Sequence, residues 1–233
     1  MTKTLVVISG GMDSATALYK AMDETEVIQT LSFDYGQRHV TELSYAGRMA
    51  GKLNLPHAII DLRSIGQFLK GSALSDETVA VPEGHYAEET MKLTIVPNRN
   101  TIMLSQAVGA AIGLGADEVW AGMHAGDHPV YPDCRPEFVN ALNDLIAIAT
   151  ETLVQVMTPF ISIEKSEIAK IGHELGVPYE ETWSCYKGGN VHCGRCSTCV
   201  ERAEAFHIAS VPDPTLYEDP DFWKQAVEEF ANR

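Results

Sequence analysis

Short apolar runs alternate with amphipathic stretches along most of the chain. Runs rich in branched aliphatic residues, typical of strands, occupy residues 4–8, 27–33, 57–62, 118–121 and 153–157. Stretches with helical spacing of apolar residues or high helix propensity predict helices over 13–22, 41–53, 101–114, 141–150 and 164–175. Helix-ending signals such as Asn54-Leu55-Pro56 and Gly176-Val177-Pro178 separate several of these elements. The alternation predicts an α/β fold, a doubly wound parallel sheet.

Two segments do not follow the alternation. Residues 66–97 are rich in Gly, Ser, Pro and acidic residues, so we expect a long excursion that could form a lid. The cysteine segment 183–199 and a terminal helix follow the last predicted helix of the sheet domain. We therefore expect a nucleotide-binding domain over 1–180 and a small zinc-binding helical appendage over 181–233.

Composition and charge narrow the classes of partner. The 233 residues include 45% hydrophobic and 21% charged residues, which is ordinary for a globular protein. The net charge of −15, with a pI near 4.8, disfavours a polynucleotide substrate because phosphate backbones are normally bound by a basic face. The N-terminal segment lacks the features of a signal peptide, and no apolar run reaches membrane-spanning length. We expect a cytoplasmic protein with neither membrane nor nucleic acid as a partner.

The segment Ser9-Gly10-Gly11-Met12-Asp13-Ser14 joins the first predicted strand to the first predicted helix. At such a junction the backbone N–H groups and the helix dipole can bind phosphate, and glycines let the backbone approach an anion closely. No lysine follows, so the loop is neither a Walker A loop nor a dinucleotide fingerprint. A Gly-Gly pair alone could be a turn that binds nothing. The complete motif in this position favours a phosphate site.

Four of the five cysteines lie within fifteen residues, with the spacing C-x7-C-x2-C-x2-C. They are Cys185, Cys193, Cys196 and Cys199. Such clustering indicates metal ligation, and four thiolates suit a closed structural zinc site. An iron–sulfur cluster is the alternative, because Cys-x2-Cys-x2-Cys also occurs in ferredoxin-type sites. Gly188, Gly189 and Gly194 are expected to form tight turns between the ligands.

Other chemistry-bearing residues have competing interpretations. Cys134 could be a nucleophile, but a small buried side chain is the favoured interpretation. His124 and His128 have the spacing of helical metal ligands, yet Gly126 and Pro129 argue against a helix there. We expect this segment to be a loop that contacts substrate.

Four further motifs accompany the Gly-rich loop. They are Phe33-Asp34-Tyr35-Gly36-Gln37-Arg38-His39, Val96-Pro97-Asn98-Arg99-Asn100, Tyr131-Pro132-Asp133-Cys134-Arg135-Pro136-Glu137-Phe138 and Thr182-Trp183-Ser184-Cys185-Tyr186. The loop resembles the signature of the PP-loop ATPases, which cleave ATP between the α- and β-phosphates. The whole set, from about Leu5 to Phe206, resembles the QueC family of 7-cyano-7-deazaguanine synthases. Other PP-loop enzymes share only the first motif.

This resemblance implies an ATP-dependent ligase that converts 7-carboxy-7-deazaguanine and ammonia into the nitrile on the queuosine pathway. It also implies a nucleotide site, with Mg²⁺ at Asp13, formed by Ile8, Ser9, Gly10, Gly11, Met12, Asp13, Ser14, Asp34 and Gln37. Asp13 and Ser14 are also expected to act in catalysis. In the substrate site, we expect Asp127 or Asp133 to accept hydrogen bonds from the purine edge, and Arg99 or Arg135 to hold the carboxylate. Asp133 and Arg135 could instead form a structural pair.

One segment departs from the family pattern. Before Tyr-Pro-Asp-Cys the family usually has Asp, an aromatic residue, Ser and Gly, where this chain has Asp127-His128-Pro129-Val130. The change could tune the same reaction, stop it at the amide, or mark a relative that serves DNA or protein modification. Two further alternatives are a PP-loop enzyme that modifies transfer RNA directly and a zinc-bearing nucleotide sensor. We expect a homodimer.

Overall fold

Five parallel strands form one sheet in the computed structural model, which describes residues 1–38, 40–86 and 91–232. The strand order is β3-β2-β1-β4-β5. The strands are β1 (Lys3–Val7), β2 (Glu26–Asp34), β3 (His57–Asp61), β4 (Glu118–Trp120) and β5 (Gln155–Met157). Each coincides with a predicted strand to within a few residues, which confirms the expected parallel α/β sheet.

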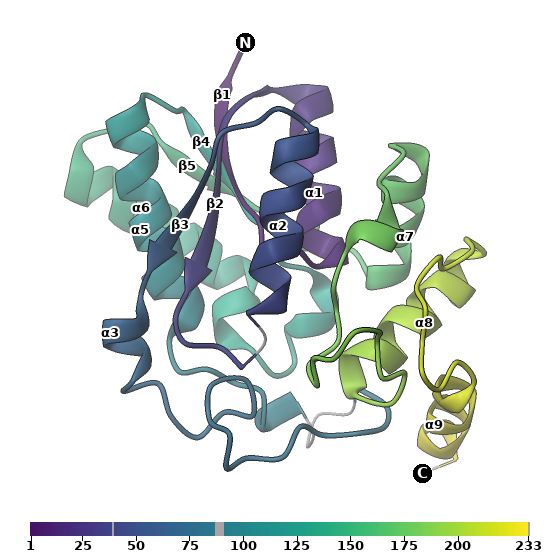
Figure 1. The fold of residues 1–233 in the computed structure, drawn as a ribbon. Coiled ribbons are helices and arrows are strands. Elements are labelled where there is room, and N and C mark those ends of the chain that lie inside the picture. Colours follow the sequence, from purple (N-terminus) through teal and green to yellow (C-terminus); the bar gives the residue numbers. More distant parts are fainter. Residues whose placement is uncertain (39, 87–90, 233) are drawn as a thin grey trace.

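Helices cover both faces of the sheet, because successive strand residues point to opposite sides. Leu5 belongs to the core beneath α5 (Arg99–Leu114) and α6 (Pro136–Thr150). Its neighbour Val6 belongs to the core beneath the helices of the other face. Figure 1 shows these two layers. The helices of the second face are α1 (Met12–Glu24), α2 (Thr41–Lys52) and α7 (Lys165–Glu174).

Most predicted helices have the expected ends, and the largest difference is at the start of α6. This helix begins at Pro136, ahead of the predicted Ala141. Proline is favoured at the first helical position because its missing N–H would have no intrahelical partner there. Helix α5 begins at Arg99, after Asn98 adopts a left-handed conformation with φ of 55°. Short helical turns complete this domain: α3 (Arg63–Gly66), η1 (Ala125–Asp127), η2 (Pro132–Cys134) and η3 (Tyr179–Glu181).

The order of the strands determines where a ligand site can form. β1 lies at the centre, with β2 on one side and β4 on the other, so the chain reverses its direction of winding there. In open α/β sheets, ligands bind in the crevice beyond the carboxyl ends of the strands at this reversal point. The Gly-rich loop follows β1 directly.

The C-terminal segment is bonded to the sheet domain. Trp183 N donates to Gly10 O at 2.8 Å. Arg202, on α8 (Ser197–Ala209), is fully buried and donates to Thr182 Oγ1 at 2.7 Å and to Tyr179 O at 3.0 Å. The final helix, α9 (Phe222–Ala231), packs against α8. The expected domain boundary near residue 180 stays a prediction, and these contacts cross it.

The described part of the excursion predicted over 66–97 lies beyond the carboxyl ends of β2 and β3, at the bottom of Figure 1. Residues 87–90 of the excursion lie outside the described residues, and so does His39 of the motif that begins at Phe33. Its first part packs Leu69 and Leu74 against Tyr35. Further along, Glu83 forms an antiparallel bridge with Cys196, which attaches the excursion to the cysteine segment. Among the described residues, no helix is long and apolar enough to span a membrane.

Candidate functional site

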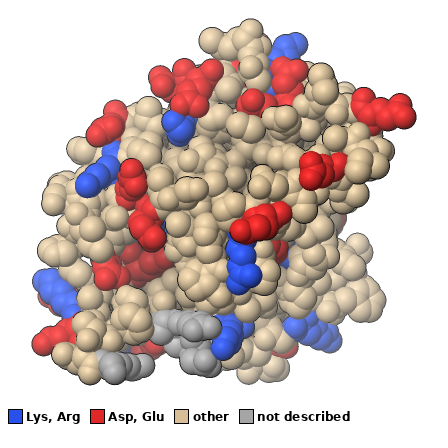
Figure 2. All heavy atoms as spheres, turned by 180° about the vertical axis from the view of Figure 1, so that it is seen from behind, with Lys and Arg blue, Asp and Glu red and all other residues tan. Residues whose placement is uncertain are grey.

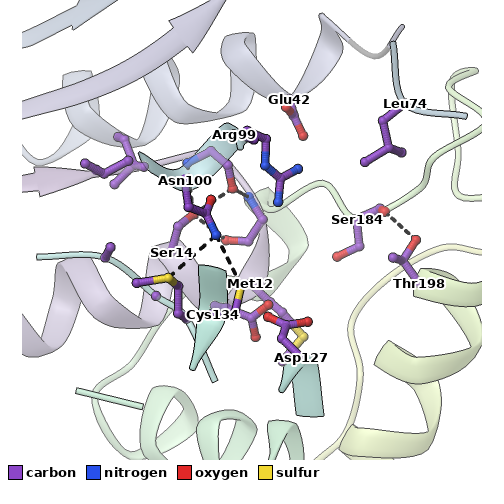
Figure 3. A pocket seen from close by; sticks show the side chains of 18 of the residues that line it. Met12, Ser14, Glu42, Leu74, Arg99, Asn100, Asp127, Cys134, Ser184 and Thr198 are labelled. Atoms are coloured by element: carbon purple, nitrogen blue, oxygen red, sulfur yellow. Dashed lines mark hydrogen bonds between the residues drawn. The ribbon is translucent and has the colours of Figure 1, made fainter. Parts of the chain in front are cut away.

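A cavity of about 280 Å³ lies at the carboxyl end of the sheet, where the strand order reverses. The Gly-rich loop and the ends of β1, β2 and β4 form its floor, and α2, α5 and the cysteine segment contribute its walls. Figure 3 shows side chains from these elements pointing into the cavity. The lining includes most of the predicted site residues: Ile8, Ser9, Gly11, Met12, Asp13, Ser14, Gln37, Arg99 and Asp127.

The Gly-rich loop is held by its own serines. Ser14 Oγ donates to Gly11 O at 3.1 Å and accepts from Ser9 N at 3.1 Å, while Gly11 N donates to Ser9 Oγ at 3.3 Å. Within the described residues, no side chain caps the N-terminus of α1 at Gly11. The first-turn amides of a helix have no intrahelical partner and carry a partial positive charge, so this end can bind an anion.

Gly10 fits a position that no other residue would occupy without strain. Its φ is +92°, and a Cβ atom built on it would lie 2.3 Å from the carbonyl oxygen of Glu42. The loop therefore contacts the first turn of α2 backbone to backbone. Although Gly10 does not line the cavity, this contact sets the position of α2 relative to the loop.

Lys165 was not found by the sequence analysis, yet it lies beside the Gly-rich loop. Its Nζ is 3.3 Å from Asp13 Oδ2 and 2.6 Å from Glu201 Oε2. Burial opposes the charge on Lys165, but the carboxylates of Asp13 and Glu201 outweigh it and raise the lysine pKa. Burial also raises the pKa of Glu201, and Lys165 opposes that change. A cation is thus fixed at the Gly-rich loop even though no lysine follows the loop in sequence.

Four tyrosines also line the cavity. Tyr35 and Tyr131 are buried, Tyr86 and Tyr186 are partly buried, and all four line the cavity together with Arg99. Burial is the largest cause of the raised pKa of Tyr131, so its hydroxyl stays neutral. Aromatic faces with one guanidinium suit a flat, anionic ligand.

Gln37 and Glu42, near the start of α2, also line the cavity. Gln37 is buried, and its amide is used by the backbone: Oε1 accepts from Tyr35 N at 2.9 Å, and Nε2 donates to Phe33 O at 3.0 Å. Glu42 lines the cavity, and from the described residues its carboxylate accepts one long bond, 3.5 Å, from Gln37 Nε2. Burial raises the pKa of Glu42 to about 7, although Arg99 and Gln37 act in the opposite direction.

Four predicted site residues do not line the cavity: Gly10, Asp34, Asp133 and Arg135. Asp34 accepts from Gly36 N at 3.0 Å and stabilises the turn after β2. Asp133 accepts from the backbone N of Asn100 at 3.1 Å. Arg135 is exposed, and its Nε donates to His128 O at 2.8 Å. No ion pair joins Asp133 to Arg135 in the described part of the chain.

The segment from His124 to Cys134 wraps around the lower side of the cavity. His124 is buried, and its Nε2 lies 3.6 Å from Asp127 Oδ2. The short turn η1 replaces the α-helix that would align His124 with His128, in agreement with the expected loop. Cys134 is buried and accepts a hydrogen bond from Asn100 Nδ2 at 3.2 Å. Burial raises the pKa of the Cys134 thiol, which agrees with a buried, unreactive side chain.

The four clustered cysteines form a site suited to a metal ion. Their sulfur atoms all lie within 4.8 Å of one another, and all four side chains are buried. Four backbone N–H groups point at two of the sulfurs: Lys187 and Cys193 donate to Cys185 Sγ, and Arg195 and Cys196 donate to Cys193 Sγ, at 3.3–3.4 Å. Such donors stabilise thiolates. The turns at Gly188, Gly189 and Gly194 have positive φ, as expected.

The parallel sheet, the Gly-rich loop at the reversal point and the adjacent lysine define a nucleotide-binding protein of the PP-loop ATPase type. A family model described as "Queuosine biosynthesis protein QueC" matches residues 3–210. The chain therefore belongs to the QueC family.

Relatives share nearly the full length of the chain. It is 54% identical over 231 residues to a 7-cyano-7-deazaguanine synthase of Rhizobium johnstonii, with 98% of each chain covered. It is 54% identical over 228 residues to the enzyme of the same name from Ruegeria pomeroyi, which covers 97% of this chain and 99% of that one. Among solved structures, NMN synthetase from Francisella tularensis has a TM-score of 0.50 at 15% identity, covering 97% of this chain and 85% of that one. This last likeness concerns the fold alone.

Proposed function

We propose that the protein converts 7-carboxy-7-deazaguanine and ammonia into 7-cyano-7-deazaguanine at the expense of two ATP molecules. One observation carries this proposal: a single cavity is lined by the Gly-rich loop and Lys165 and also by four tyrosines, Arg99 and Glu42. A nucleotide and a flat carboxylic acid can then meet in the same space. The full-length similarity to proteins with this name supports the same substrate.

The proposed reaction uses the same chemistry twice. The substrate carboxylate attacks the α-phosphorus of ATP, pyrophosphate leaves, and ammonia then displaces AMP from the acyl carbon to give the amide. In the second round the amide oxygen attacks another ATP, and loss of AMP and a proton leaves the nitrile. The two oxygens of the acid depart in two AMP molecules, so no other dehydrating agent is required.

Residues of the cavity supply charge stabilisation and orientation for these steps. The amides of the Gly-rich loop and Lys165 would bind the departing pyrophosphate, whose developing charge is best stabilised by groups already in place. Arg99 would hold the substrate carboxylate, while the tyrosines pack against its rings. Arg135, the other candidate for this role, is exposed outside the lining, which favours Arg99.

Two metal ions fit the side chains. Asp13 Oδ1 is buried without a hydrogen-bond partner among the described residues, and a carboxylate oxygen beside a phosphate site is a typical Mg²⁺ ligand. Bound there, Mg²⁺ would neutralise phosphate charge. The four-cysteine site offers no position for water, so we infer a structural Zn²⁺ that fixes the segment carrying Trp183 and Ser184.

We also infer that the substrates are small molecules and that the protein is a cytoplasmic homodimer. The face in Figure 2 supports the first inference, because its Lys and Arg side chains are scattered rather than gathered into a basic patch. A direct modifier of transfer RNA would require such a patch. An enzyme that stops at the amide, or one that serves DNA or protein modification, is the remaining alternative from the altered segment at His128.

Product analysis tests the proposal. Purified protein with ATP, Mg²⁺, ammonium and 7-carboxy-7-deazaguanine should yield the nitrile, with two AMP and two pyrophosphate for each nitrile formed. Accumulation of the amide under excess ATP and ammonium would identify an amide-forming relative. Binding of ATP without any release of AMP would instead indicate a nucleotide sensor.

A further inference from the structure

The backbone of Glu42 is held in place by a contact within the protein, before any ligand binds. It lies in the first turn of α2, and its carbonyl oxygen occupies the space that a Cβ atom on Gly10 would fill. The side chain therefore starts from a point fixed relative to the Gly-rich loop. Figure 3 places Glu42 and Arg99 in the upper part of the cavity and Asp127 in the lower part.

Glu42 differs from the other described carboxylates that line the cavity, because the nearby Arg99 lowers its pKa without forming an ion pair with it. Asp13 is paired with Lys165, and Asp127 Oδ2 lies 3.6 Å from His124 Nε2. In the described part of the chain, Glu42 forms no ion pair, and its bond from Gln37 is long. The side chain of Glu42 is partly exposed where it lines the cavity, so its oxygens can accept hydrogen bonds from a ligand bound there.

The surroundings of Glu42 indicate the shape and polarity of a ligand that would contact its carboxylate. Tyr35, Tyr186 and Arg99 line the same part of the cavity, so a ligand beside Glu42 would be flanked by aromatic rings and a cation. A 2-amino-4-oxopyrimidine ring carries two adjacent N–H donors, on N1 and on the exocyclic amine. These can donate in parallel to the two oxygens of one carboxylate.

We propose that Glu42 is the specificity-determining residue for the guanine-like edge of the substrate and accepts both N–H donors through its carboxylate. This inference rests on the proposed function, since it assigns a residue to that substrate. It replaces the expected roles of Asp133, which is bonded to Asn100 N outside the cavity lining, and of Asp127, which lies beside His124. The raised pKa of Glu42 agrees with a carboxylate whose partners arrive with the ligand.

The test is a binding cycle that combines one substitution with one change in the ligand. The ligands are 7-carboxy-7-deazaguanine and its analogue without the exocyclic amino group, and their affinities are measured by calorimetry with α,β-methylene-ATP present. The wild type should bind the analogue about 10- to 100-fold more weakly, because one acceptor is left unpaired. Glu42→Gln should bind the full substrate more weakly by a similar factor and should discriminate the two ligands by less than about threefold.

Controls separate this role from a structural one. Glu228→Gln, at an exposed position on α9, should behave as the wild type. Glu42→Asp keeps the carboxylate and should retain part of the discrimination, which keeps the test valid if Glu42→Gln unfolds. The affinity for α,β-methylene-ATP should change little in either variant.

The outcomes distinguish this inference from the proposed function. Equal discrimination by wild type and Glu42→Gln, or no binding of the substrate by the wild type, would overturn the role of Glu42. If the wild type binds the substrate and discriminates against the analogue but forms no nitrile, the proposed function is overturned. Glu42 would then remain the residue that recognises the N–H donors of the ligand.

Discussion

Lys165 Nζ lies 3.3 Å from Asp13 Oδ2, which joins the start of α7 to the Gly-rich loop that follows β1. The lysine is also paired with Glu201 on α8, so one partly buried cation connects the sheet domain to the helix that begins beside the cysteine site. The Gly-rich loop thus has a fixed positive charge beside it. Two carboxylates on different elements hold it in place.

Replacement of Lys165 by Met should reduce kcat/KM for ATP by more than about tenfold, since a preorganised charge contact to a leaving group contributes on the order of 3 kcal/mol. Lys165→Arg should recover part of the loss because it keeps the charge. Lys170→Met, on an exposed position of the same helix, is the matched control and should be near wild type. Steady-state release of pyrophosphate measures all three. Wild-type rates in Lys165→Met would remove the lysine from the reaction.

Asp13→Asn should lower turnover by more than about tenfold and raise the Mg²⁺ concentration needed for half-maximal rate. The physical reason is that an amide oxygen binds Mg²⁺ more weakly than a carboxylate does. Rates measured over a range of Mg²⁺ concentrations separate this effect from simple misfolding, which excess Mg²⁺ would not rescue. An unchanged Mg²⁺ dependence would contradict a metal at Asp13.

The pH dependence of kcat/KM for the deazaguanine acid should contain a contribution from Glu42. With a pKa of about 7 in the free enzyme, this carboxyl is charged above that pH and neutral below it. Arg99, Tyr35 and Gln37 face it, and of these Arg99 stays charged throughout this range. The ionised form accepts two hydrogen bonds, so kcat/KM should fall about tenfold between about pH 8 and about pH 6. The fall should be absent in Glu42→Gln, and an identical profile in both proteins would refute the assignment.

The cysteine site should hold about one metal ion per chain, which elemental analysis can identify as zinc. Cys196→Ser should lose the metal and lower the unfolding temperature, because the core of the segment consists of Trp183 and the four cysteines themselves. Cys134→Ser is the matched control, since this thiol lies outside the cluster and should leave the metal content unchanged. Iron with visible absorbance in anaerobically prepared protein would replace the zinc assignment by an iron–sulfur cluster.

Gly10→Ala should destabilise the protein by about 1–3 kcal/mol, because the new Cβ meets the carbonyl of Glu42 and the backbone has a positive φ. It should also weaken ATP binding, since relief of the clash moves the loop. Gly109→Ala is the control: its added Cβ meets nothing within 4 Å, and alanine is the better helix former on α5. Thermal unfolding compares the two. A Gly10→Ala protein as stable as the wild type would show that α2 is not fixed by this contact.

Local signals allowed much of the fold to be predicted. Strands β1 to β5 were found because a buried parallel strand is a short apolar run whatever surrounds it. The Gly-rich loop and the cysteine site were found because each has its functional groups within a few residues, at spacings that one type of site requires. The predicted start of α6, at Ala141, was wrong. The helix begins at Pro136, and proline is favoured at the first helical position, so the sequence did contain a signal for the true start.

The sequence by itself therefore determined the order of the elements, the loop at the end of β1 and the four-cysteine site, because these depend on residues that are neighbours in the chain. Only the tertiary structure decided which distant side chains share the cavity. Lys165 and Glu42 reach the Gly-rich loop because the crossover connections bring α7 and α2 to the edge of the sheet where β1 ends. For the same reason spacing could not show that Asp133 is bonded to the backbone of Asn100. The direction of a side chain at a sheet edge depends on packing between elements that are far apart in sequence.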